Sequence, residues 1–224
     1  MNIKNTLLPL LTILGLTSCN QSSDNQTSGQ VQANSTFDKE IFTLYSRTEN
    51  AVKVARAMTT SNETFDLHLY ELNTSTPEAA QQTTISVQTL TKQELETKST
   101  ELKNTYNWTP FKGDNVLFVQ IQPRGFKNEI ELLDKRQEIE DKLNTVLETN
   151  KLGEWFAGDI GPGGGNMLYT VTNIEITLQT ILQVLKQNNL DKNVLIGRRI
   201  MIDKGDWFYE VIYPTKFTGT FNTM

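Results

Sequence analysis

The sequence predicts an α+β fold, a class of domain in which strands and amphipathic helices pack around one core. From residue 37 onward, short apolar runs recur between turn-forming residues, as expected for strands. Other segments repeat apolar residues at helical spacing, and 178–185 is the clearest case. Cys19 is the only cysteine, so no disulfide can form within the chain and the core alone has to hold the domain.

The first half of the domain, residues 37–107, is predicted to run strand, helix, strand, strand, helix. The first helix, at 51–58, is predicted from an apolar face with the i, i+3, i+4, i+7 spacing of a helix. This face is formed by Ala51, Val54, Ala55 and Met58. The expected strands are 41–47, 65–72 and 83–90, and the second helix is expected at 92–106.

The second half, residues 115–214, follows a segment in which Pro110 and Gly113 break the pattern and mark a boundary. Its order, β-α-β-β-α-β with an added strand, predicts a ferredoxin-like sandwich, in which two helices cover one face of an antiparallel sheet. The first half is expected to be either a related lobe or an α+β half packed against this one. The expected strands are 116–121, 154–160, 167–171, 194–202 and 207–213, the expected helices are 128–150 and one through 178–185, and 215–224 is expected to be a tail.

The first eighteen residues, MNIKNTLLPLLTILGLTS, have the organisation of an export signal. Lys4 gives a short positive start, and residues 6–16 form an apolar stretch of the length found in signal peptides, roughly 7–15 residues. The stretch is too short to cross a bilayer, which needs about 20 apolar residues. Residues 1–18 are therefore predicted to be a signal peptide that is removed.

The four residues Leu16-Thr17-Ser18-Cys19 resemble the lipobox of bacterial lipoproteins, a leucine followed by two small residues and a cysteine. The resemblance implies that Cys19 becomes the first mature residue and carries a diacylglycerol and an acylated amino group. More than one acyl chain gives stable membrane anchoring, whereas a single chain gives only marginal binding. The alternative is an ordinary secretory signal with an unmodified cysteine.

Residues 19–36 are predicted to be a flexible tether, because Val31 and Ala33 are the only apolar residues after Cys19 in this segment. In lipoproteins, the residue after the cysteine influences sorting. The aspartate that retains lipoproteins in the inner membrane is absent here, so the resemblance implies the outer membrane. An early acidic cluster of surface-exported lipoproteins is also absent, which favours the periplasmic face.

The mature chain is mildly acidic. The full sequence has a net charge of -5, and removal of Lys4 with the signal peptide takes it to about -6. An acidic chain lacks the basic face that nucleic-acid binding needs and the polybasic patch that attracts lipid headgroups. We therefore expect a protein partner, with no nucleic acid, and contact with the membrane only through Cys19.

Three consecutive segments of the second half carry a second resemblance: the helix KRQEIEDKLNTVLE, the strand pair GEWFAGDIGPGGGNMLYTV and the helix LQTILQVLK. This order resembles the ferredoxin-like domain of uncharacterised bacterial proteins distantly similar to the regulators of ribonuclease E activity. The resemblance covers residues 115–214 and implies the fold alone. It implies no binding partner for this chain, because those regulators act in the cytoplasm and the export signal directs this chain elsewhere.

The stretch GDIGPGGGNM, residues 158–167, raises the question of a phosphate-binding loop. Such loops continue into a helix, with a Lys and a Ser or Thr after the last glycine. Here Asn166 and Met167 lead into a strand, so the stretch is predicted to connect two strands. Aromatic residues are enriched at binding hot spots. The candidate binding face around this connection and the last strand consists of Trp155, Asp159, Asn166, Trp207 and Tyr209.

The sequence offers no catalytic set. His68 is the only histidine and Cys19 is assigned to lipid, so neither a zinc site nor a catalytic triad can be assembled, and we expect no metal and no cofactor. Two carboxylates can hydrolyse glycosidic bonds, and Glu154 and Asp159 flank the glycine stretch. Asp203 and Asp206 flank a turn, where aspartate is common for conformational reasons.

These observations predict a non-enzymatic, lipid-anchored envelope lipoprotein that acts as a protein-binding module. One alternative is an immunity or inhibitor protein against a periplasmic toxin, which fits the acidity, the size and the anchor. The other is a carboxylate-dependent hydrolase that uses Glu154 or Asp159.

Overall fold

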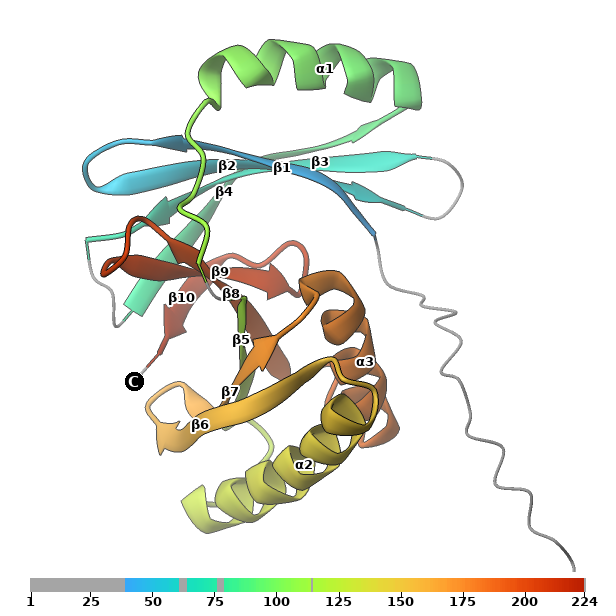
Figure 1. Cartoon of the computed structure of the whole chain (residues 1–224), viewed down its shortest axis with the longest axis vertical. Coiled ribbons are helices and arrows are strands. Elements are labelled where there is room, and N and C mark those ends of the chain that lie inside the picture. The colour runs from blue at the N-terminus through green and yellow to red at the C-terminus, as the bar shows by residue number, and fades with distance from the viewer. Residues whose placement is uncertain (1–38, 61–63, 76–78, 114, 224) are drawn as a thin grey trace, which may run out of the picture. The chain divides into compact units, whose positions relative to one another are not determined.

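Ten strands and three helices make up the part of the chain that the computed structural model describes, residues 39–60, 64–75, 79–113 and 115–223 (Figure 1). The strands form two antiparallel sheets of five strands each. Together with the helices they confirm the predicted α+β class. The described residues all belong to one compact unit.

The first sheet, sheet A, has the strand order β1-β2-β3-β4-β10. Its first four strands follow one another along the chain, and its fifth comes from the C-terminal end. All the pairs are antiparallel. The strands are β1 (Glu40–Arg47), β2 (Ala51–Thr59), β3 (Phe65–Asn73), β4 (Ala79–Leu90) and β10 (Gly219–Asn222).

The second sheet, sheet B, has the strand order β6-β7-β5-β8-β9 and is also antiparallel. All six residues of β5 are buried, as expected for an apolar run at the centre of a sheet. The strands at the two ends of the sheet are β6 and β9. The strands are β5 (Val116–Ile121), β6 (Gly153–Gly161), β7 (Gly164–Val171), β8 (Val194–Met201) and β9 (Trp207–Tyr213).

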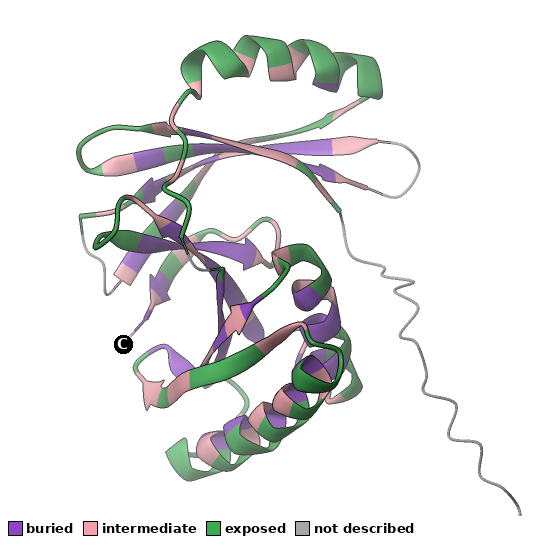
Figure 2. Cartoon of the chain, in the orientation of Figure 1, coloured by how far each residue is buried: buried purple, intermediate pink, exposed green. Residues whose placement is uncertain are grey.

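The helices α2 (Glu129–Thr149) and α3 (Ile174–Gln187) cover one face of sheet B and contact each other (Figure 1). Their apolar faces join β5 and β7 in the largest hydrophobic cluster. The helix α1 (Lys92–Thr105) packs on the face of sheet A that points away from sheet B, and Figure 2 shows that most of α1 is exposed. Each helix begins at a side-chain cap, which satisfies a free backbone N–H. The caps are Thr91, Asn128 and Asn173.

Sheet A contacts both faces of β9. On one face, Phe208 packs with Tyr45 and Tyr70 of sheet A. On the other face, Tyr209 packs with Phe118 and with Phe221 of β10. Successive strand residues point to opposite faces, so β9 is enclosed between the early strands of sheet A and its C-terminal strand.

The predicted helix at 51–58 is wrong, because these residues form β2. The helical spacing arose because this strand is buried on both faces, with Val54 and Ala55 both inaccessible to solvent. A strand of this kind carries apolar residues without strict alternation, and its pattern cannot be told from that of a buried helix. The first half therefore runs β-β-β-β-α.

The predicted tail at 215–224 contains β10, which pairs with β4. The predicted boundary segment also connects the halves: Trp108 bridges to Tyr45 of β1, and Phe111 bridges to Met201 of β8. The two halves therefore share elements at both of these places. The other predicted strands and helices are present, with ends that differ by a few residues.

We expect Phe221→Ala to destabilise the protein by about 3–5 kcal/mol, because truncation of a buried phenylalanine removes apolar burial and leaves a cavity. Phe221 is 0% exposed and contacts the rings of Phe118 and Tyr209. Urea unfolding of the full chain measures the change. The matched control is Phe111→Ala, whose side chain is 42% exposed and should cost far less. Equal losses for the two variants would contradict the role given to β10.

Candidate functional site

Four charged side chains lie together where sheet A meets sheet B, and we call them the ionic cluster. They are Glu40 on β1, Arg56 on β2, Arg198 on β8 and Glu210 on β9. Arg198 and Glu210 are register partners on neighbouring strands, so their side chains lie on the same face of sheet B. Glu210 is fully buried, and Glu40 is the most exposed member.

Arg198 connects the carboxylates of the cluster. Its Nε donates to Glu210 Oε2 at 2.9 Å, and its Nη1 donates to Glu40 Oε2 at 3.2 Å. Arg56 Nε donates to the same Glu40 oxygen at 3.0 Å. The cluster thus pairs two positive with two negative charges, which offsets part of the several kcal/mol that burial of each ion costs.

Two tyrosines of sheet A complete the coordination of Glu210. Tyr45 donates its hydroxyl to Glu210 Oε2 at 2.9 Å, and Tyr70 donates to Glu210 Oε1. Burial, together with the negative charge of Glu210, raises the pKa of both tyrosines well above the ordinary value of 10.0. Both hydroxyls therefore stay protonated and remain donors at neutral pH.

The carboxyl of Glu40 responds to two opposing effects. Burial raises its pKa, but the positive charges of Arg198 and Arg56, with a hydrogen bond from Thr43, outweigh burial. The net pKa of Glu40 is lower than the ordinary 4.5. Glu40 is therefore ionised in the folded protein at neutral pH.

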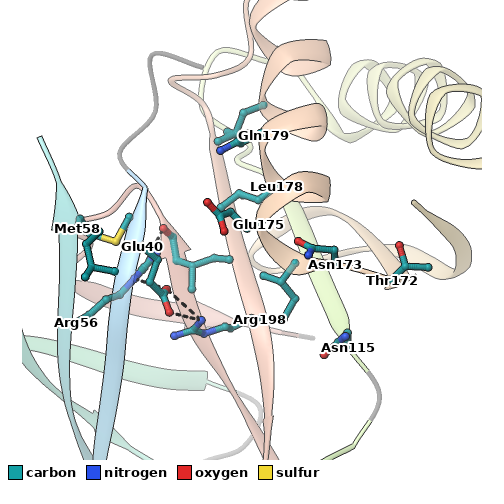
Figure 3. A pocket seen from close by; sticks show the side chains of 14 residues that line it. Glu40, Arg56, Met58, Asn115, Thr172, Asn173, Glu175, Leu178, Gln179 and Arg198 are labelled. Atoms are coloured by element: carbon teal, nitrogen blue, oxygen red, sulfur yellow. Dashed lines mark hydrogen bonds and ion pairs between the residues drawn. The ribbon is translucent and has the colours of Figure 1, made fainter. Parts of the chain in front are cut away.

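A cleft of about 380 Å³ opens beside the ionic cluster, between the start of β1 and the helix α3 (Figure 3). Its volume is within the range of about 300–1,000 Å³ found for ligand sites. In Figure 3 Glu40 and Arg198 face each other at one side, and Glu175, Leu178 and Gln179 line the helix side. The remaining lining residues are Ile41, Arg56, Met58, Asn115, Thr172, Asn173, Ile174, Leu182 and Ile212.

Three of the four charged groups of this cleft, all but Glu175 of α3, are engaged within the protein. Glu40 accepts hydrogen bonds from Thr43, Arg56 and Arg198. Arg56 also donates to the backbone of Ile212 at 3.3 Å. The cleft floor therefore supports the packing of the two sheets, and Glu40, Arg56 and Arg198 are already paired with one another.

The predicted binding face is divided by the structure. Trp155 and Asp159 lie on β6 and Trp207 lies on β9, at opposite ends of sheet B with three strands between them. Asn166 and Tyr209 are buried. The five residues therefore do not form one surface, because the sequence does not reveal that β6 and β9 are the two outermost strands.

The β6 end of this sheet is exposed. Trp155 is 40% and Phe156 is 44% exposed, and Glu154 and Asp159 on the same strand are also exposed. The register with β7 shifts between Trp155 and Ala157, so Phe156 is the extra residue of a β-bulge. Bulges turn side chains at sheet edges. Two adjacent aromatic side chains are therefore presented at an open strand.

The glycine stretch forms the β6–β7 hairpin, which confirms the predicted strand-to-strand connection. Its glycines at 163–165 are buried rather than open to a ligand. Gly164 has a φ of 132°, and a Cβ there would lie 2.0 Å from the carbonyl oxygen of Ile121. At Gly163 a Cβ would meet the carbonyl oxygen of Asn222 at 2.6 Å. Close approach to β5 and β10 therefore explains why glycine occupies these positions.

Amide side chains fix this hairpin from the inside. Gln120 Nε2 donates to Asn166 Oδ1 at 3.0 Å and to the backbone of Asn222. Asn166 Nδ2 donates in turn to Asp159 Oδ1 at 2.7 Å. Asn166 is therefore a structural residue that orients Asp159 at the exposed edge.

His68 occupies a structural position on β3. Its ring nitrogens lie 3.1 Å from the carbonyl oxygen of Thr215 and 3.0 Å from Thr84 Oγ1. Burial lowers the pKa of His68 below 6.5. The ring therefore holds the segment before β10 against sheet A.

The carboxylates considered for hydrolysis lie in different settings. Glu154 lines an open depression of about 440 Å³ together with Glu148 and Lys151. Asp203 accepts hydrogen bonds from the backbone N–H groups of Gly205 and Asp206, as aspartates in turns do. Asp159 and Glu154 share the β6 edge and neither lines the cleft of Figure 3.

Within the residues that the structure describes, no group of three His, Cys, Asp or Glu side chains is arranged to hold a metal ion. The same residues contain no helix that is long and apolar enough to span a membrane. Cys19 and the predicted tether at 19–36 lie outside the described residues. Comparison with known protein families, with curated proteins and with solved structures found no match.

The ionic cluster was not predicted from the sequence. Two signals were present: Glu210 interrupts the apolar strand WFYEVIY, and Arg56 interrupts the buried run AVKVARAM. A charged residue within an apolar strand has to find a partner when it is buried. Which partner it finds depends on the packing of the two sheets, and this is not visible along the chain.

We expect Glu40→Gln to cost about 1.5–3 kcal/mol of stability at neutral pH, because it removes a charged acceptor of hydrogen bonds. The pKa of Glu40 is lowered by folding, so its ionised form contributes stability above the ordinary pKa of 4.5, and this contribution is lost as the pH falls through the folded value. Urea unfolding at several pH values measures the difference between wild type and variant. The difference should shrink in acid.

The matched control for this experiment is Glu96→Gln, which changes an exposed carboxylate on α1. It should cost little at any pH, because exposed charges contribute little to stability. A difference between wild type and Glu40→Gln that stays constant down to the lowest pH would contradict the assignment.

Proposed function

We propose that this chain is a lipid-anchored lipoprotein of the bacterial cell envelope whose folded domain binds another protein. The lipobox at Leu16-Thr17-Ser18-Cys19 and the polar segment up to residue 36 support the anchor and the tether. The sorting pattern after Cys19 favours the outer membrane, facing the periplasm. The domain acts by binding and not by catalysis.

We also propose that the second half has the ferredoxin-like plan. Its elements follow in the order β5, α2, β6, β7, α3, β8. The sheet order β6-β7-β5-β8 places the first and third strands of this unit at the centre, and α2 and α3 lie on one face. In this description β9 is an added strand beside β8.

The observation that carries the binding function is the open edge at β6. Two sheets have four edge strands, β1, β10, β6 and β9, in the described part of the chain. β9 is enclosed by sheet A and contacts β4. β10 is only four residues long and pairs with residues 79–82 of β4, so residues 83–90 of β4 also form an edge, but this stretch carries no charged residue. β1 is partly paired, because the backbone of Trp108 donates to Tyr45 at 3.0 Å.

By contrast, β6 is nine residues long and exposes Trp155 and Phe156. Natural proteins protect exposed edges with charged residues, proline, β-bulges or a covering segment. The sequence of β6, GEWFAGDIG, has two carboxylates and a bulge at Phe156, but it contains neither lysine nor proline. Unpaired backbone groups beside exposed aromatic residues are the surface that an added strand of a partner uses.

A photo-crosslinking amino acid placed at position 156 of the full chain in its own cells should capture a partner protein. The control position is 207, because Trp207 is 36% exposed at the other end of sheet B. We expect an adduct of one defined mass at 156 that is absent at 207, followed by its identification by mass spectrometry. No adduct at 156, or the same adducts at both positions, would contradict binding at β6.

The anchor has a separate test. Labelled fatty acid should enter the wild-type chain and not Cys19→Ala, because the thioether-linked and amide-linked chains both depend on this cysteine. The variant should leave the membrane fraction, since stable anchoring needs more than one lipid chain. Equal labelling of the two proteins would contradict the lipoprotein assignment.

A further inference from the structure

We propose that the β6 edge binds an extended segment with two basic residues on one face, four positions apart, as an added sixth strand of sheet B. This inference rests on the proposed binding function and names the chemistry of the partner. It follows from the charge of the edge and from the placement of two carboxylates on one face of it.

The edge is acidic and no cation on the strand offsets it. Glu154 and Asp159 are exposed, and β6 contains no Lys or Arg. The guanidinium of Arg136 lies near the position of Gly158, but it is paired with Glu140 and donates to the backbone of Asn166. The edge therefore retains negative charge for an incoming strand.

The depression at the start of β6 is also negatively charged. Glu148 and Glu154 line it with one cation, Lys151. Together with Asp159 these groups carry more negative than positive charge. Opposite charges placed across a strand pair stabilise it by about 0.2–1 kcal/mol, and like charges in that position are unfavourable. A basic segment is thus the complementary occupant.

The register with β7 places the two carboxylates on one face of the sheet. Glu154 pairs with Thr170 and Asp159 pairs with Asn166. Thr170 and Asn166 are four positions apart on a regular strand, so their side chains point to the same face. Glu154 and Asp159 are five positions apart along β6, and Phe156 is the one extra residue, which the bulge accommodates. A partner strand meets both carboxylates when its basic residues are four positions apart, or about 13 Å.

The aromatic side chains give this edge apolar surface as well as charge. Trp155 and Phe156 lie between the carboxylates along the strand and are each partly exposed. Trp155 pairs with Tyr169, so its ring points to the opposite face of the sheet from Glu154 and Asp159. The basic residues of the partner therefore meet the carboxylates, and the residues between them meet the indole ring.

A second copy of the chain fits the edge poorly. Antiparallel pairing of two β6 strands brings Glu154 and Asp159 of both copies to one seam, and each full chain has a net charge of -5. Like charges across a strand pair are destabilising. The charge of the edge therefore selects a basic partner over self-association.

The experiment uses synthetic nine-residue peptides of valine and threonine. The first has lysine at its third and seventh positions, the second has glutamate at the same positions, and the third has lysine at its third and sixth positions, so that the charges point to opposite faces. Binding to the full chain in detergent is measured by calorimetry, and the site is located by amide NMR shifts. We expect the first peptide to bind at β6, about tenfold or more tighter than the other two.

Charge variants test whether Glu154 and Asp159 cause the preference for the first peptide. Glu154→Lys with Asp159→Asn should remove the preference for the first peptide, and asparagine at 159 retains an oxygen that can accept from Asn166. The matched control, Glu96→Lys with Asp134→Asn, makes the same charge change at exposed residues of α1 and α2 and should retain the preference. Unfolding midpoints show that both variants fold.

The outcomes separate this inference from the proposed function. Equal binding of the three peptides, NMR shifts away from β6, or the same loss in both variants would overturn the basic-segment proposal. An adduct at position 156 in cells that persists in the β6 charge variant would also overturn it and leave the binding function standing. An adduct with the mass of two copies of this chain would favour self-association instead. Absence of any adduct would contradict the binding function itself.

Discussion

The packing of the two sheets depends on the ionic cluster, in which two positive and two negative side chains lie together. Glu210 is fully buried, and Arg198, Tyr45 and Tyr70 surround its carboxylate and donate hydrogen bonds to it. Removal of one partner from such a cluster leaves an uncompensated charge, which is far more costly than the loss of an exposed pair. The relative position of sheet A and sheet B is therefore fixed by hydrogen-bond geometry as well as by apolar contact.

The end of the chain supports this arrangement from the other face of β9. Phe221 of β10 packs against Phe118 and Tyr209, while the backbone of Asn222 accepts from Gln120. The glycine hairpin follows from the same packing, because only residues without a Cβ fit so close to β5 and β10. The stretch that suggests a phosphate loop in the sequence is a close-packed turn in the structure.

The packing of the two sheets buries some surfaces and leaves others available for binding. The cleft beside α3 is bordered by the paired charges of the ionic cluster, β9 is enclosed, β1 is partly paired, and the open part of β4 beyond β10 carries no charged residue. The β6 edge keeps its unpaired backbone, its aromatic side chains and its carboxylates facing outward. The property that distinguishes it is the combination of an open strand with one sign of charge.

The sequence by itself determined the α+β class, the position of most strands and helices, and the strand-to-strand role of the glycine stretch, because periodicity and turn chemistry are local properties. It did not determine β2, since a strand buried on both faces has no alternation. The sequence suggested one binding face that included Trp155 and Trp207, although the two lie at opposite ends of sheet B. Strand order, the partners of Glu210 and the open edge at β6 were decided only by tertiary structure, because they arise from contacts between residues far apart in the chain.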